Sequence, residues 1–273
     1  MASHGGVTIA LTWTALADGD GPVLRYVPEL RDGTPIADLA CIVRGRSAAD
    51  AAHAAIAQLP AWLLATEDTT LAAALVRSGA APKRHAIVMQ CDLRINAPVL
   101  DVDSRFTCVD LPDSPADPQW TAILPSWRAA FPSDHPDHFA GDDDTAIAFI
   151  MRLVDGTELG PLHRSTTLLL DSSGVPVAGI MVNIRPQDPP LGGPWIADIW
   201  RDPSLRGTGV GAMLIGRARR LLREDGQVSL GLAVTAGNPA RHTYAGQGFS
   251  TVIESQTVLL PPAPEPAFQF PSR

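Results

Sequence analysis

The chain alternates short apolar stretches with amphipathic stretches along most of its length. In the first half, two alanine-rich stretches with helical spacing predict helices at 47–58 and 68–79. Runs of apolar, β-branched and aromatic residues predict strands at 7–16, 22–27, 39–45, 61–66 and 84–93. Strands interleaved with helices are typical of an α/β fold, so this half is expected to form a sheet flanked by helices.

The second half shows the same alternation. Helical spacing predicts helices at 120–131 and 142–154, a third from about 210 to 225 and a fourth after 238. Strands are predicted at 165–171, 176–185, 195–200, 228–235 and 250–260. The fold class expected for the chain is therefore α/β, with a mixed central sheet flanked by helices.

A change of composition separates the halves. Residues 96–118 are rich in proline and aspartate, which favours a boundary or a linker, although 105–111 within them has the pattern of a strand. We therefore expect an N-terminal domain at 1–95, a boundary region at 96–118 and a C-terminal domain at 105–273.

Composition and charge limit the classes of partner. The 273 residues are 45% hydrophobic and 18% charged, with a net charge of −8, which is typical of a globular protein. Binding to nucleic acids needs clustered positive charge, so no nucleic-acid partner is expected.

No apolar run approaches the roughly 18 residues of a membrane span, and the N-terminal stretch lacks the positive charges of a signal peptide. Because Cys41, Cys91 and Cys108 are few and widely spaced, they predict no disulfide framework. We expect a cytoplasmic protein without a membrane partner.

The stretch LRGTGVGAMLIGRARR, residues 205–220, places three glycines where a helix must begin. Val210, Leu214 and Ala218 lie on one face of that helix, but its first turn lacks the usual serine or aspartate cap. Its backbone N–H groups are therefore expected to lack an acceptor, and such a helix start suits a phosphate. Neither the nucleoside-triphosphate loop nor the dinucleotide fingerprint is present.

Two motifs together carry a family resemblance. The loop that runs from Arg206 to Gly211 resembles the acyl-CoA pyrophosphate loop of the GNAT superfamily of N-acetyltransferases. The stretch GNPARHTYAGQGF, residues 237–249, resembles the next helix of that family and its Gly-Phe ending. The resemblance covers about 106–260. It implies an acyltransferase that moves an acetyl group from acetyl-CoA to a primary amine of a small molecule or peptide, by direct attack. Neither the acceptor nor the oligomeric state is indicated.

The resemblance also implies roles for individual residues. Tyr244 matches the tyrosine that protonates the leaving sulfur, and Asp198 lies where some members keep an acidic base. The residues that correspond to the cofactor site are Ile199, Trp200, Arg201, Arg206, Gly207, Thr208, Gly209, Val210, Gly211, Ala212 and Asn238. Each side chain also has a structural interpretation: Asn238 could cap a helix, Tyr244 could belong to the core and Asp198 could form an ion pair.

A polar segment, PSDHPDHF, lies between the first two helices of this half. It contains Asp134, His135, Asp137 and His138. The spacing of the histidines is compatible with a metal, but the proline between them argues against one helical face, so no metal site is expected. The segment falls where the family places its acceptor-binding loop, and solvated loop charges are the alternative.

The first half resembles a degenerate copy of the second. Residues 65–80 can be laid on 234–249 without a gap, which places Thr69 opposite Asn238 and Leu75 opposite Tyr244. The helix that follows Ser47 carries an ordinary capping box with Asp50. One acyl-CoA is therefore expected to bind, not two. The alternatives are a generic α/β half without common origin and, for the whole chain, a non-enzymatic acyl-CoA sensor or an interaction protein.

Overall fold

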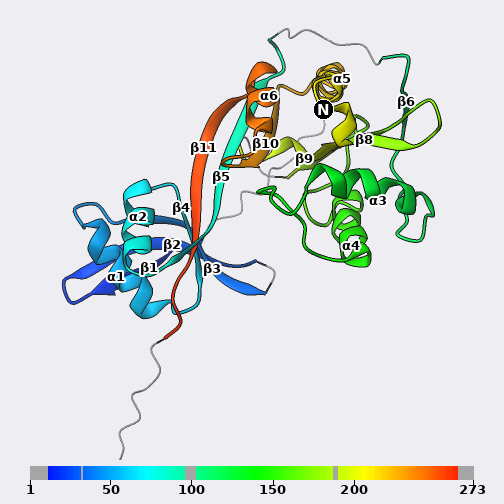
Figure 1. The fold of residues 1–273 in the computed structure, drawn as a ribbon. Coiled ribbons are helices and arrows are strands. Elements are labelled where there is room, and N and C mark those ends of the chain that lie inside the picture. The colour runs from blue at the N-terminus through cyan, green and yellow to red at the C-terminus, as the bar shows by residue number, and fades with distance from the viewer. Residues whose placement is uncertain (1–11, 32, 96–102, 187–189, 264–273) are drawn as a thin grey trace, which may run out of the picture. The chain divides into compact units, whose positions relative to one another are not determined.

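A computed structural model describes residues 12–31, 33–95, 103–186 and 190–263 (Figure 1). The chain divides into two compact units. Unit 1 consists of Met1–Ala86 and Glu254–Arg273, and unit 2 consists of Ile87–Ile253. Two strands, β5 and β11, run from one unit into the other.

Unit 1 contains a sheet with the strand order β1-β2-β3-β4-β11. Its strands are β1 (Thr14–Asp18), β2 (Gly21–Arg31), β3 (Thr34–Ile42), β4 (Leu63–Thr66) and the last part of β11 (Ser250–Leu259). The helices α1 (Ala48–Gln58) and α2 (Thr69–Arg77) pack on this sheet through buried alanines and leucines (Figure 1).

Unit 2 contains a sheet with the strand order β5-β10-β9-β8-β7-β6. Its strands are β5 (Ala81–Asp92), β6 (Thr107–Val109), β7 (Thr167–Leu170), β8 (Pro176–Arg185), β9 (Gly193–Arg201) and β10 (Ser229–Thr235). Its helices are α3 (Gln119–Ala130), α4 (Asp143–Val154), the 3-10 turn η1 (Pro203–Leu205), α5 (Val210–Glu224) and α6 (Ala240–Gly246).

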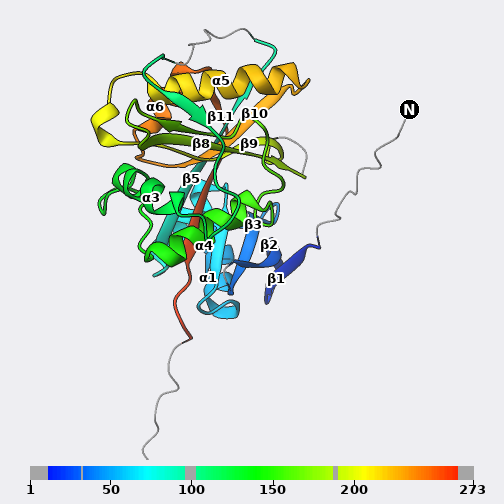
Figure 2. The same cartoon turned by 90° about the vertical axis from the view of Figure 1, so that its right-hand side faces the viewer.

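Helices cover both faces of the unit 2 sheet (Figure 2). On one face, α5 buries the apolar stripe that the sequence predicted, with Val210, Leu214 and Ala218 at most 3% exposed. On the other face, α3 and α4 bury a second cluster that includes Trp120, Trp127 and Ile150. The predicted α/β class, a mixed sheet flanked by helices, is confirmed.

The two units repeat one pattern of strand directions. In unit 1, β1, β2 and β3 are antiparallel neighbours and β3 is parallel to β4, with α1 between them in sequence. In unit 2, β7, β8 and β9 are antiparallel neighbours and β9 is parallel to β10, with α5 between them. This repetition supports the prediction of two similar halves.

Some predicted elements differ from the observed ones. The strand β2 extends beyond 22–27, and β3 begins at Thr34 because the two form a hairpin whose turn contains Gly33 at φ +76°. Much of the predicted strand at 7–16 lies outside the described residues. The 105–111 stretch does contain a strand, β6, which pairs with β7.

The predicted domain limits at 1–95, 96–118 and 105–273 remain predictions. The division into compact units assigns the end of β11 to unit 1.

Candidate functional site

The start of α5 is open to solvent and is not capped by a side chain. Gly209 precedes the helix at φ +84°, Gly207 lies at φ +79°, and a Cβ built on either of them meets no atom within 4 Å. The first backbone hydrogen bond of the helix runs from the Met213 N–H to the Gly209 carbonyl. The N–H groups of Val210, Gly211 and Ala212 therefore remain available, as the sequence predicted, at the positive end of the helix dipole.

The strand β9 reaches this helix start with one edge unpaired. Its parallel pairing with β10 includes Trp195 with Gly231 and Ile196 with Leu232, and no later pair occurs among the described residues. On its other edge, β9 stays paired with β8 as far as Arg201, with a bulge at Ala197 where pairs shift from Ile196 to Asp198. Residues after the bulge thus keep free backbone groups toward β10.

The predicted backbone contacts, Ile199 to Arg201, lie on this unpaired edge. The Trp200 side chain is buried, and its ring fills the space above Gly179, where a Cβ would lie 2.3 Å from it. Only the backbone of Trp200 is therefore available to a ligand. Beyond the strand, Arg206 and Thr208 are exposed, and the Thr208 hydroxyl donates to the Leu205 carbonyl at 2.7 Å.

Asp198 lies next to the bulge and accepts a hydrogen bond of 2.7 Å from the Trp127 indole of α3. Its side chain keeps partial access to solvent, yet burial among protein atoms raises its pKa to about 6. The Trp127 indole and the Ile199 N–H lower this pKa, and the charge of Asp137 raises it. No ion pair to Asp198 is found among the described residues, so the structural ion pair considered from the sequence is not present.

Tyr244 lies in α6 with its side chain 8% exposed. Its ring packs in the core cluster and lies 6.1 Å from the ring of Phe249, centroid to centroid. Within the described part of the chain, its hydroxyl has no hydrogen-bond partner. Burial raises the pKa of the phenol, and the charges of Asp198 and Asp137 raise it further. The phenol therefore stays protonated at neutral pH. Its ring belongs to the core, and its role as a proton donor stays a prediction.

Asn238 precedes α6 and makes two hydrogen bonds through its buried side chain. Its oxygen accepts from the Ala240 N–H, the first of α6, at 2.8 Å, although Pro239 and not Asn238 is the N-cap residue of the helix. Its amide donates to Asp137 at 2.8 Å, and the Thr235 hydroxyl at the end of β10 donates to the other oxygen of Asp137. The loop between α3 and α4 is thus fixed to the turn that holds Asn238.

Unit 1 lacks these features at the corresponding places. Ser47 caps α1 by accepting from the Asp50 N–H, and its hydroxyl donates to the Asp50 carboxylate. The capping box is confirmed, although Asp50 binds the serine hydroxyl instead of a backbone amide. Leu75 is fully buried where unit 2 has Tyr244. Thr66, which the overlay places opposite Thr235, donates to the Ala40 carbonyl of β3 at 2.7 Å, so the threonine side chain spans the two strands.

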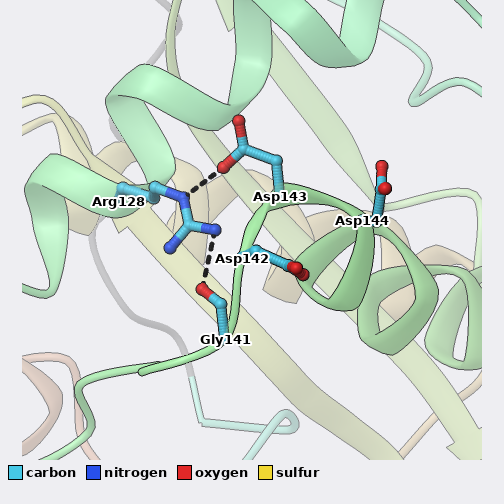
Figure 3. Close-up of a pocket in the computed structure, with 5 residues that line it drawn as sticks. All are labelled: Arg128, Gly141, Asp142, Asp143 and Asp144. Carbon is cyan, nitrogen blue, oxygen red and sulfur yellow. Dashed lines mark hydrogen bonds and ion pairs between the residues drawn. The ribbon is translucent and has the colours of Figure 1, made fainter.

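A shallow pocket lies elsewhere on unit 2, between the ends of α3 and α4 (Figure 3). Arg128 donates to Asp143 at 2.7 Å and to the Gly141 carbonyl at 3.0 Å, and Asp142 and Asp144 complete the lining. None of these residues belongs to the predicted site. The exposed ion pair joins two helix ends, and we assign it a structural role.

The described residues contain no group of three or more His, Cys, Asp or Glu side chains arranged to hold a metal ion. His135 and His138 instead make hydrogen bonds within the loop between α3 and α4. The His135 ring accepts from the Asp137 N–H, and the His138 ring donates to the Phe131 carbonyl. Within the same described ranges, none of the helices has the length and apolar character needed to cross a membrane.

Two residues of this site were not identified from the sequence. Trp127 was placed in a helix without a role, and Thr235 was placed at the end of a strand. Trp127 has T-shaped ring contacts with Phe131 at 5.8 Å and Phe139 at 5.7 Å, so the loop folds around the residue that binds Asp198. An indole on the buried face of a helix is the only sequence signal, and it does not indicate a polar partner.

Comparison with known families gives a match to part of unit 2. Residues 120–249 match the family described as the acetyltransferase (GNAT) family. No curated protein matches the chain in sequence.

Several solved structures resemble the chain over most of its length. A GCN5-related N-acetyltransferase from Sphaerobacter thermophilus has a TM-score of 0.58 and 15% identity, and the match covers 93% of this chain and 81% of that one. A tandem GNAT protein from the clavulanic acid biosynthesis pathway has a TM-score of 0.53 and 17% identity, with coverage of 93% and 84%. A GNAT-family acetyltransferase from Colwellia psychrerythraea has a TM-score of 0.54 and 12% identity, with coverage of 94% and 88%. At these identities the likeness concerns the fold.

Proposed function

Because residues 120–249 match the GNAT acetyltransferase family, we propose that unit 2 transfers an acetyl group from acetyl-CoA to a primary amine. The observation that carries the proposal is the uncapped start of α5 beside the unpaired edge of β9. Together they supply N–H donors for a pyrophosphate and, next to them, a strand edge for an extended amide-bearing chain.

The residues present fit this cosubstrate. Gly207 and Gly209 leave open space at positive φ, so a phosphate can approach the backbone from Gly207 to Ala212. The edge from Ile199 to Arg201 would pair with the amides of the pantetheine arm. Asn238 retains one amide hydrogen for the same ligand, because its other hydrogen serves Asp137.

Asp198 takes the proton that the acceptor must lose before attack, and Tyr244 supplies the proton that the leaving sulfur needs. Asp198, with a pKa of about 6, is mostly ionised at neutral pH and takes a proton from the acceptor ammonium. The amine nitrogen then forms a bond to the thioester carbon, and the carbon–sulfur bond breaks. Tyr244 donates its phenolic proton to the leaving sulfur, and the acetylated nitrogen loses its extra proton, which leaves a neutral amide and restores the phenol.

An assay of thiol release tests this function. The full chain is incubated with acetyl-CoA and a panel of small amines, amino sugars and peptides, and acetylated products are identified by mass spectrometry. We expect thiol release that depends on the acceptor and fails without it. If acetyl-CoA binds but no amine is acetylated, the chain is an acyl-CoA sensor, which is the alternative reading of the same site.

A further inference from the structure

The loop between α3 and α4 brings a second carboxylate to the site of Asp198 and Tyr244. Asp137 accepts a hydrogen bond from Thr235 through one oxygen and from Asn238, at 2.8 Å, through the other. Its own N–H is held by the His135 ring at 3.1 Å. The Asp137 carboxylate is thus fixed in place while each oxygen keeps a lone pair for a further donor.

Neither carboxylate has a cationic partner in the part of the chain that the structure describes. The side chains that bind them, Thr235 and Asn238 for Asp137 and Trp127 for Asp198, are all neutral. No arginine, lysine or histidine forms an ion pair with either carboxylate within the described ranges. They nevertheless interact, since the charge of Asp137 raises the pKa of Asp198. The charge of Asp137 opposes the ionisation of Asp198, and a cation between the two carboxylates would relieve this repulsion.

An unpartnered donor lies beside this pair. The Tyr244 hydroxyl has no hydrogen bond among the described residues although its side chain is 8% exposed, and both carboxylates influence it. The hydroxyl oxygen is not one of the buried polar atoms that lack a partner, so it reaches solvent and is free to donate to a ligand. The three side chains therefore belong to one site, in which the Tyr244 hydroxyl is available to a ligand.

Unit 1, the degenerate copy, shows which hydrogen bond the corresponding threonine makes where there is no such site. Thr66 donates across the strands to the Ala40 carbonyl at 2.7 Å, whereas Thr235 donates to Asp137. The bond to Asp137 directs the hydroxyl of Thr235 away from that cross-strand role. Asp137 is thus tied to the features that distinguish unit 2 from its copy.

We propose that unit 2 selects an acceptor amine that carries a second positive charge, and that Asp137 recognises this second charge. The proposal rests on the proposed function. The reacting nitrogen gives its proton to Asp198 and becomes neutral, while the second ammonium stays charged and donates to Asp137. An aliphatic diamine is the simplest acceptor with this chemistry. A hydrogen bond between charged groups in a partly buried site favours the diamine over a monoamine by about tenfold or more.

The test compares matched acceptors. Ethylenediamine, putrescine and hexamethylenediamine are each assayed against the monoamine with the same carbon chain, at saturating acetyl-CoA and low ionic strength. For wild-type protein we expect kcat/KM for at least one diamine to exceed that of its monoamine by about tenfold or more, through a lower KM. A preference of this kind decreases as salt is added, because the two charges are screened.

Asp137→Asn removes the charge but keeps the shape and one acceptor oxygen. In this variant we expect the diamine and its monoamine to be used about equally, with the KM for acetyl-CoA changed by less than a few-fold. Asp113→Asn is the matched control, because Asp113 is an exposed acid of unit 2 without a hydrogen bond among the described residues, and it should keep the preference.

The outcomes separate the two proposals. Equal use of diamine and monoamine by the wild type contradicts this inference and leaves the acetyltransferase function standing. A preference that survives in Asp137→Asn also contradicts it. If no amine is acetylated although acetyl-CoA binds, the proposed function itself is wrong. The wild-type comparison needs no variant, so it decides even if Asp137→Asn does not fold.

Discussion

The Trp127 indole donates a hydrogen bond of 2.7 Å to the Asp198 carboxylate. This bond joins α3, on one face of the unit 2 sheet, to β9 at the point where its pairing with β10 ends. The bond stabilises the charged form of the carboxylate and so lowers the pKa of Asp198. Burial acts in the opposite direction and is the larger effect, so the pKa remains raised.

Trp127→Phe should move the acidic limb of the pH–rate profile to higher pH. Phenylalanine keeps much of the ring packing and removes the donor, so the pKa of Asp198 should rise above about 6. We expect a change of about one to two pH units, because a hydrogen bond to a charged group contributes about 1.5–3 kcal/mol and one pKa unit corresponds to about 1.4 kcal/mol. Trp120→Phe on the same helix is the control, since the Trp120 indole donates to the Ser114 carbonyl instead. An unchanged profile in Trp127→Phe would show that Asp198 is not the base.

Asp198 should make the stability of the fold depend on pH. The folded-state pKa of about 6 lies above the ordinary value of 3.8, so the folded protein holds this proton more tightly than the unfolded chain. The contribution of Asp198 to the free energy of unfolding should therefore be largest below about pH 4 and be lost as the pH rises through 6.

Asp198→Asn removes this dependence. Relative to wild type, the variant should gain about 2–3 kcal/mol in free energy of unfolding between pH 4 and pH 7, measured by denaturant titration at several pH values. Because other groups titrate alike in both proteins, the difference isolates Asp198. A difference that stays constant with pH contradicts the raised pKa. The same variant should lose acetyl transfer.

Tyr244→Phe should reduce kcat by about 10²–10⁴-fold, which is the usual contribution of a general acid. The ring and its contact with Phe249 remain, so the affinity for acetyl-CoA should change by less than a few-fold. Tyr26→Phe is the matched control, because Tyr26 is the only other tyrosine and is buried in unit 1. Turnover of Tyr244→Phe within a few-fold of wild type would leave Tyr244 a packing role alone.

Much of the fold follows from local pattern. The helical spacing of Val210, Leu214 and Ala218 predicted which face of α5 is buried, and the missing cap predicted its open N-terminus. The partner of β11 could not be predicted in this way. Its residues Gln256–Leu259 pair with β4, which lies nearly two hundred positions earlier in the chain, and strand pairing over such separations depends on the tertiary fold.

The candidate site was predictable only in part. Tyr244, Asp198 and Asn238 were indicated by resemblance, whereas Asp137 was one of four polar residues in a loop with no pattern to distinguish it. Its contacts with Thr235 and Asn238 arise because the loop folds around Trp127. The bulge at Ala197 is likewise a property of register, which a single strand's sequence does not encode.

The central claim is that one acyl-CoA binds, at the start of α5 in unit 2. Gly209→Asp places a side chain and a negative charge where the pyrophosphate must lie, and it should abolish binding. Gly174→Asp is the control: Gly174 also has a positive φ, +79°, and open space around its Cβ, but it lies in the turn between β7 and β8. Both variants are expected to lose about 1 kcal/mol of stability from the strained backbone.

Calorimetric titration of the full chain with acetyl-CoA tests this claim most directly. We expect a stoichiometry near one for wild type and Gly174→Asp, and no measurable binding for Gly209→Asp. Unit 1 should contribute nothing, because Ser47 caps α1 and Asp50 adds a negative charge at that helix start. A stoichiometry of two, or unchanged affinity in Gly209→Asp, would contradict the account.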